Sequence, residues 1–271
     1  MTAAEVVQRM LDAGRHMVHE QGIQVSLEDL TYDKVIERAG VPRSSAYHLW
    51  GTKSDFLHEL LLHLAESARR ATEADARRTI DTVRNIVLKN ITKLGDHNER
   101  RRVLLEAARE GVQQSFDAIA DSNEWYIYLA LTAAARSAGD DKDRLEIAAA
   151  LLDGQKKLID YFADLYSQML EVLKYRMRHD QYTVRHLAVA GAAIIEGLAM
   201  RHFLPRAINR ASQPPAVETT SWALGGLLEP GLPGPSPQGE VAGNGWSLAA
   251  IAFLGIVDAL TEPIPPGDLD G

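Results

Sequence analysis

The chain has 271 residues, a formal net charge of −8 and a sequence pI near 5.6, so it cannot coat nucleic acid through bulk positive charge. It contains no cysteine, which excludes disulfides, cysteine-ligated metal sites and thiol catalysis. The N-terminus lacks the basic start and apolar run of a signal peptide, and the longest apolar stretches are too short to span a bilayer. We therefore expect a cytoplasmic protein without a membrane partner.

Two helices are predicted near the N-terminus. The first is indicated by an apolar pattern at helical spacing that includes Met10 and stops at Gly22. After a connector, Thr31 can cap a second, short helix, and Asp33 in its first turn suits the positive end of that helix. Gly40 is expected to end it, because glycine adopts the left-handed conformation common after helices.

A third and a fourth helix follow closely. Pro42 suits the start of a helix, and residues 43–50 can form two turns after it. The next apolar helical pattern begins at about Lys53. Residues 31–50 therefore have the order and length of a helix-turn-helix unit, whose second helix can enter the major groove of DNA.

Residues 79–208 keep a helical pattern of apolar residues without strand-like alternation. Within this region, residues 142–178 could form one long helix or two, and another helix is expected over 184–203. The pattern predicts an all-α fold for the main part of the chain.

The composition changes near the C-terminus. Residues 213–245 are rich in proline and glycine, which predicts a linker or loop rather than a long helix. Residues 246–261 then form a strongly apolar segment, predicted to be a buried final helix. We divide the chain into a head, residues 1–55, and a larger helical domain, residues 56–271.

The sequence of residues 22–57 resembles the DNA-binding domain of the TetR family of bacterial regulators. The residues that carry the likeness are Gly22, Thr31, Val35, Ile36, Ala39, Gly40, Val41, Ser44, Ser45, Tyr47, Trp50, Lys53 and Leu57. The connector after Gly22 is longer than is usual in the family, and Leu49 and Trp50 replace a frequent His-Phe pair. The large aromatic at position 50 is expected to keep its packing role.

The resemblance implies an N-terminal three-helix DNA-binding domain followed by a helical ligand-binding and dimerisation domain. It also implies a TetR-like repressor that binds a palindromic operator in double-stranded DNA as a homodimer and is released by a small-molecule ligand. The alternative is a structural or partner-regulated DNA-binding protein without a small-molecule effector.

Seven residues of the motif are candidates for DNA contact. Arg43, at the start of the presumed recognition helix, can place its guanidinium on a guanine edge, and Ser44 and Ser45 are short donors suited to base contacts. The phosphate contacts are expected from Thr31 with its helix N-terminus, Tyr47 and Lys53, and His48 can contact either bases or phosphates.

The head is not basic. Residues 1–70 contain eight Lys and Arg residues and ten Asp and Glu residues. Non-specific attraction to DNA should therefore be weak, and affinity should depend on a few positioned contacts and on dimerisation.

An apolar effector site is predicted in the larger domain. Trp125, Tyr128 and Phe162 are the candidate lining residues, since small-molecule sites combine apolar walls with a few polar groups. The alternative for each of them is an ordinary place in the hydrophobic core.

The segments 184–203 and 246–261 are the candidate dimer interface, because small residues in the first allow close helix packing. Glu196, an acid in an apolar segment, could face the partner. The sequence lacks the common hydrolase, nucleotide-binding and zinc-protease motifs, so we expect no enzyme, no catalytic residues, no metal and no cofactor.

Overall fold

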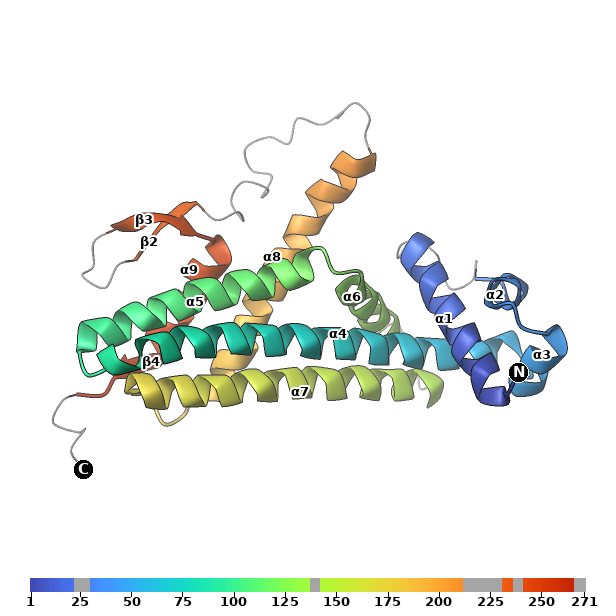
Figure 1. Cartoon of the computed structure of the whole chain (residues 1–271), viewed down its shortest axis with the longest axis horizontal. Coiled ribbons are helices and arrows are strands. Elements are labelled where there is room, and N and C mark those ends of the chain that lie inside the picture. The colour runs from blue at the N-terminus through green and yellow to red at the C-terminus, as the bar shows by residue number, and fades with distance from the viewer. Residues whose placement is uncertain (22–29, 137–141, 212–230, 236–240, 266–271) are drawn as a thin grey trace. The chain divides into compact units, whose positions relative to one another are not determined.

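A computed structural model describes residues 1–21, 30–136, 142–211, 231–235 and 241–265 (Figure 1). Helices dominate these ranges, and the described strands are short and all follow α7. The helices are α1 (Ala3–Gln21), α2 (Tyr32–Ala39), α3 (Arg43–Leu49), α4 (Lys53–Asn90), the short turn η1 (Ile91–Lys93), α5 (His97–Ala120), α6 (Asn123–Arg136), α7 (Lys142–Leu173), α8 (Val184–Ala211) and α9 (Leu248–Leu260). The strands are β1 (Tyr175–Met177), β2 (Leu232–Pro235), β3 (Val241–Trp246) and β4 (Thr261–Pro263).

The chain divides into two compact units. The first contains residues 1–73 and 122–156, and the second contains residues 74–121 and 157–271. Helices α4 and α7 each contribute to both units. The first unit thus combines α1 to α3 and the first part of α4 with α6 and the first part of α7. The domain boundary after residue 55, expected from the motif, stays a prediction.

Three residues mark the start of α2 and the turn between α2 and α3. Thr31 occupies the N-cap position of α2 with extended backbone, but its side chain makes no capping hydrogen bond. Gly40 ends α2 at φ +62°, and its N–H bonds to the carbonyls of Glu37 and Ile36. Pro42 then precedes α3 at φ −62°, the value its ring imposes. The predicted helix, turn and helix are confirmed.

The start of α4 is also as expected. Thr52 and Asp55 form a reciprocal cap there: the Asp55 N–H donates to the Thr52 hydroxyl at 3.2 Å, and the Thr52 N–H donates to the Asp55 carboxylate at 2.9 Å. This satisfies two amides that a helix start leaves without partners, which explains why α4 begins at Lys53.

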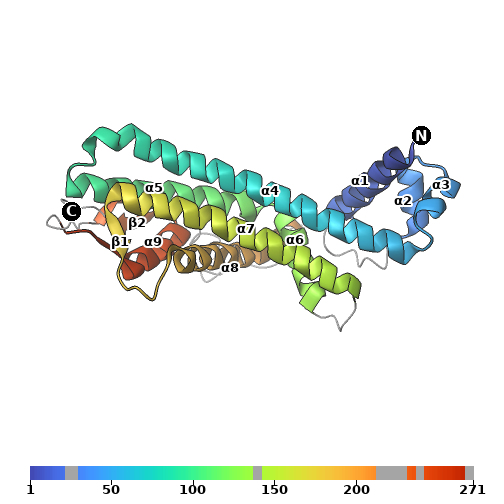
Figure 2. The same cartoon turned by 90° about the horizontal axis from the view of Figure 1, so that it is seen from below.

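In the second unit, α9 packs against α5 and α8 (Figure 2). Ser247 caps α9 by accepting a hydrogen bond from the Ala250 N–H, and Phe253 and Leu254 are buried. A Cβ on Gly191 of α8 would lie 2.8 Å from the Phe253 ring, so glycine permits this close approach. The predicted buried final helix is confirmed.

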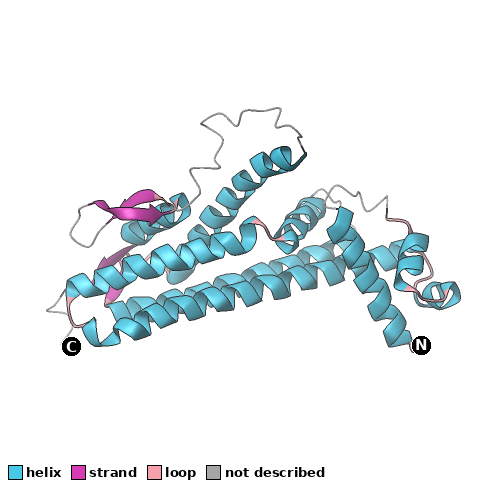
Figure 3. Ribbon diagram, turned by 45° about the horizontal axis from the view of Figure 1, so that its top comes forward, coloured by secondary structure: helices cyan, strands magenta, loops and turns pink. Residues whose placement is uncertain are grey.

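Two predictions about irregular structure are wrong. Residues 175–177 form strand β1, which pairs antiparallel with β4, although the pattern of residues 79–208 indicated only helix. Of the proline- and glycine-rich stretch, predicted to be a linker or loop, residues 213–230 and 236–240 lie outside the described residues. The rest contributes β2 and most of β3, which pair antiparallel (magenta in Figure 3). Strands of three residues are too short to show alternation, and a two-stranded ribbon tolerates proline because one edge of each strand is unpaired.

Residues 142–178 contain one long helix, α7.

Among the described residues, no helix is both long and apolar enough to cross a membrane.

Candidate nucleic-acid interface

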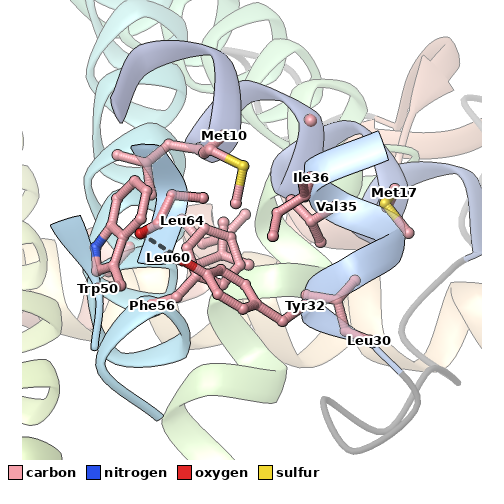
Figure 4. Close-up of a cluster of buried hydrophobic side chains, with 14 of the residues drawn as sticks. Met10, Met17, Leu30, Tyr32, Val35, Ile36, Trp50, Phe56, Leu60 and Leu64 are labelled. Atoms are coloured by element: carbon pink, nitrogen blue, oxygen red, sulfur yellow. Dashed lines mark hydrogen bonds between the residues drawn. The ribbon is translucent and has the colours of Figure 1, made fainter. Parts of the chain in front are cut away.

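The inner side of the head is an aromatic cluster from α2, α4 and the segment between α3 and α4 (Figure 4). The Phe56 ring, fully buried, lies 5.2 Å from the ring of Tyr32 and 5.3 Å from the ring of Trp50, measured between centroids. Met10 and Val35 close the cluster from α1 and α2. These contacts give the short α2 and α3 the tertiary support that helices of this length need.

A buried hydrogen bond ties α2 to α3. The Tyr32 hydroxyl donates to the backbone carbonyl of Ala46 at 2.9 Å. Burial raises the pKa of Tyr32 to about 12, so the phenol keeps the proton that it donates. Ala46 is fully buried and small, which lets α3 approach this close to the cluster.

The end of α3 is held by Trp50. Its Nε1–H donates to the Glu59 carboxylate at 2.6 Å, and only 4% of the residue is exposed. The neighbouring Leu49 packs against the same core as a half-buried residue. The aromatic at position 50 therefore has the packing role that the resemblance implied, and Leu49 contributes apolar contact rather than a polar group.

The outer side of α3 is polar. Arg43, Ser44 and His48 are exposed, and Ser45 is half-buried. Tyr47 is 48% exposed, with its ring edge-to-face against Tyr32 at 5.1 Å. A short helix is thus fixed from inside while it presents a guanidinium, hydroxyls and an imidazole outward.

The two remaining candidates flank α3. Thr31 is exposed directly before α2, and Lys53 is half-buried at the first position of α4. Both belong to the first unit, together with all of α3. Because the cap formed by Asp55 takes up two backbone groups at the start of α4, a phosphate contact there would depend mainly on the Lys53 side chain.

Sequence reasoning missed the partner of Arg43. The Arg43 Nη2 lies 2.7 Å from Oδ1 of Asp33 in the first turn of α2, and both side chains are more than half exposed. From the sequence, Asp33 is expected only to interact favourably with the positive end of α2. No local pattern indicates this ion pair, because it depends on how α2 and α3 cross.

These helices define a helix-turn-helix protein. No family model matches the sequence, and neither does any curated protein. The fold is similar to that of a solved structure described as a TetR-family transcriptional regulator from Rhodococcus sp., with 17% identity, 95% of this chain and 98% of that chain covered, and a TM-score of 0.42.

Two further solved structures are similar. One is a TetR-family transcriptional regulator from Agrobacterium tumefaciens, with 15% identity, coverage of 78% and 96%, and a TM-score of 0.41. The other is a protein described as a TetR-family regulator from Syntrophomonas wolfei, with 18% identity, coverage of 76% and 88%, and a TM-score of 0.40.

The candidate effector residues are divided between the two units: Trp125 and Tyr128 lie in the first and Phe162 lies in the second. Trp125 is 5% exposed with its ring 5.2 Å from that of Tyr126, and Tyr128 packs against the core of the first unit. Phe162 belongs to a cluster of the second unit, where its ring lies 6.0 Å from that of Tyr166. The effector site stays a prediction.

Between residues 189 and 200 the outward stripe of α8 is apolar except for one acid, and the exposed residue at its start, His186, is polar. Val189 and Met200 are 53% and 52% exposed, Ala193 is exposed, and Glu196 lies between them at helical spacing. Burial raises the pKa of Glu196 above its ordinary value. An exposed apolar stripe beside a half-buried acid is a candidate surface for a second copy of the chain.

Proposed function

We propose that the chain is a TetR-like transcriptional repressor that binds a palindromic operator as a homodimer and is released from it by an apolar small molecule. One observation carries the proposal: α3 is anchored by a buried aromatic cluster on its inner side and presents polar donors on its outer side. This is the arrangement that a helix needs to enter the major groove and contact base edges.

The residues divide into two roles. Arg43, Ser44 and Ser45 contact base edges, where a guanidinium can bond to the two acceptors of guanine. Thr31, Tyr47 and Lys53 contact phosphates, which orients the head without selecting sequence, and His48 contacts either. Few basic groups are involved, so a single head should bind weakly and the dimer should supply the rest of the affinity.

The dimer is proposed to form through α8 and α9. The outward stripe of α8 leaves Val189 and Met200 in water, and a two-fold partner would bury them. A symmetric dimer presents two recognition helices, so the half-sites should lie about 34–36 Å apart, one turn of DNA.

Selection of bound sequences from a random DNA pool tests this function. The expected result is one motif with two inverted half-sites. In the selected site, Arg43→Ala should cost about 1–3 kcal/mol at one base position, whereas Lys53→Ala should weaken binding of every sequence alike. A pool without enrichment would contradict the proposed function.

The effector is the second part of the proposal, with Trp125 and Tyr128 of the first unit, or Phe162 of the second, as the candidate lining residues. By linkage, a ligand that weakens operator binding must itself be bound more weakly by the same factor when the operator is present. Screening apolar metabolites for release of the selected DNA, then titrating the active compound with and without DNA, tests this step. If no compound releases the DNA and none copurifies with the protein, the alternative of a protein without a small-molecule effector is favoured.

A further inference from the structure

The ion pair between Asp33 and Arg43 lies at the start of the proposed recognition helix. Asp33 occupies the first turn of α2, and Arg43 is the first residue of α3. The Nη2 to Oδ1 distance is 2.7 Å, while 66% of the Arg43 side chain and 56% of the Asp33 side chain remain exposed. An ion pair this exposed contributes little to the free energy of folding. Its main effect should therefore be on how Arg43 contacts DNA.

The pair leaves most of the guanidinium available. Arginine has five N–H donors in a plane, and the closest contact with Asp33 is that of Nη2 with Oδ1. The other donors can still reach the two acceptors of a guanine edge. Asp33 can therefore hold the guanidinium plane in place while Arg43 bonds to a base.

The pair also changes how Arg43 meets phosphates. Arg43 is the one arginine or lysine in α3, and a neighbouring carboxylate offsets its charge. At a DNA site without the target sequence, a phosphate gives Arg43 another oxyanion contact. Because Asp33 already provides such a contact, Arg43 gains little binding energy there. A guanine edge presents two aligned acceptors, so Arg43 gains more binding energy at the correct base than at a phosphate.

We propose that Asp33 is a positioning residue that sets the sequence specificity of Arg43: it orients the guanidinium toward a guanine edge and weakens its attraction to phosphates. The proposal rests on the proposed function, since it requires α3 to contact DNA. It goes further by assigning a role in DNA selection to an acid outside the recognition helix.

Two simpler accounts make different predictions. If Asp33 only repelled DNA as a nearby negative charge, its removal would raise affinity for all sequences alike, with or without Arg43. If it only stabilised the start of α2, its removal would lower stability and leave the ratio of specific to non-specific affinity unchanged.

The test compares wild type, Asp33→Asn, Arg43→Ala and the double variant. Glu37→Gln is the matched control, because Glu37 is an exposed acid one turn further along α2. Each protein is titrated with a duplex selected by wild type and with a random duplex of equal length, over a range of salt concentrations. Thermal unfolding confirms that each variant is folded.

For Asp33→Asn we expect affinity for the random duplex to rise by up to about fivefold, because Arg43 is released to phosphates. The slope of log affinity against log salt for that duplex should steepen by about one phosphate contact. Affinity for the selected duplex should not rise, so the specificity ratio falls. In the Arg43→Ala background the Asn substitution should leave the ratio unchanged, and Glu37→Gln should leave it unchanged in wild type.

An unchanged ratio in Asp33→Asn, or an equal fall in the Arg43→Ala background, would overturn the inference while leaving DNA binding intact. A wild-type protein that selects no sequence would instead overturn the proposed function, and the inference with it.

Discussion

Helices α3 and α8 both pack on a hydrophobic core, but the side chains on their outer faces differ in chemistry. Helix α3 buries Ala46 and exposes Arg43, Ser44 and His48. Helix α8 exposes Val189 and Met200 and keeps its one acid half-buried. A polar face suits a polyanion with hydrogen-bonding edges, and an apolar stripe suits another protein surface. The exposed side chains, rather than the helical fold, distinguish the expected partners.

The largest effect is expected from removing residues 246–271. This deletion takes away the buried side chains of α9 and the bidentate pair of Asp258 with Arg101 of α5, at 2.6 and 2.8 Å. The exposed apolar surface should cause aggregation or leave monomers, as measured by sedimentation. Deleting only residues 266–271, which lie outside the described residues, is the control. A soluble dimer of normal size without α9 would show that the apolar face is not structural.

Phe56→Ala should be the most damaging single substitution in the aromatic cluster that supports the head. The residue is fully buried between Tyr32 and Trp50, and loss of such a ring costs about 3–5 kcal/mol. Denaturant unfolding measures this cost. Leu152→Ala, at a residue that is 65% exposed, should change stability by less than about 0.5 kcal/mol. Similar losses for both would contradict the assignment of the head core.

Gly40→Ala should have an intermediate effect. Its φ of +62° is strained for alanine by about 1–2 kcal/mol, although the space around its Cβ position is open. Gly95 also has open space and no positive φ, so Gly95→Ala is the matched control and should be neutral or slightly stabilising. Thermal unfolding of both variants separates backbone strain from packing, and a Gly40→Ala protein as stable as wild type would count against a left-handed turn.

The smallest effect is expected from pH. Burial lowers the pKa of His19 and of His63, with the Glu124 carboxylate partly opposing the shift at His19. The unfolded chain then takes up protons that the folded first unit does not, so stability is full above the unfolded pKa of about 6.5 and falls at lower pH. Unfolding measured on each side of that pH should show a smaller fall in a variant with both residues changed to glutamine. If the loss of stability at low pH is unchanged in this variant, the two histidines do not cause it.

The turn of the head could be predicted because its causes are local. Gly40, Pro42 and the aromatic at position 50 each act through their own backbone or side-chain type, and the structure has α2, α3 and α4 where these residues indicate. The final helix was equally predictable, since a segment this apolar has to be buried.

The rest depends on contacts between distant residues. The pairing of Asp33 with Arg43 follows from a helix crossing, and the pairing of β1 with β4 joins residues more than eighty positions apart. Neither leaves a periodic signal in the sequence. The candidate effector residues illustrate the same limit, because aromatic residues of helical spacing fill a core and line a pocket with the same pattern.

The central claim is that α3 selects a DNA sequence, and one affinity ratio tests it most directly. Wild-type protein is titrated with its selected duplex and with a scrambled duplex of the same length and composition, at one salt concentration. We predict at least about a thousandfold preference for the selected duplex. Arg43→Ala should reduce that preference by about tenfold or more. Equal affinity for the two duplexes would contradict the account.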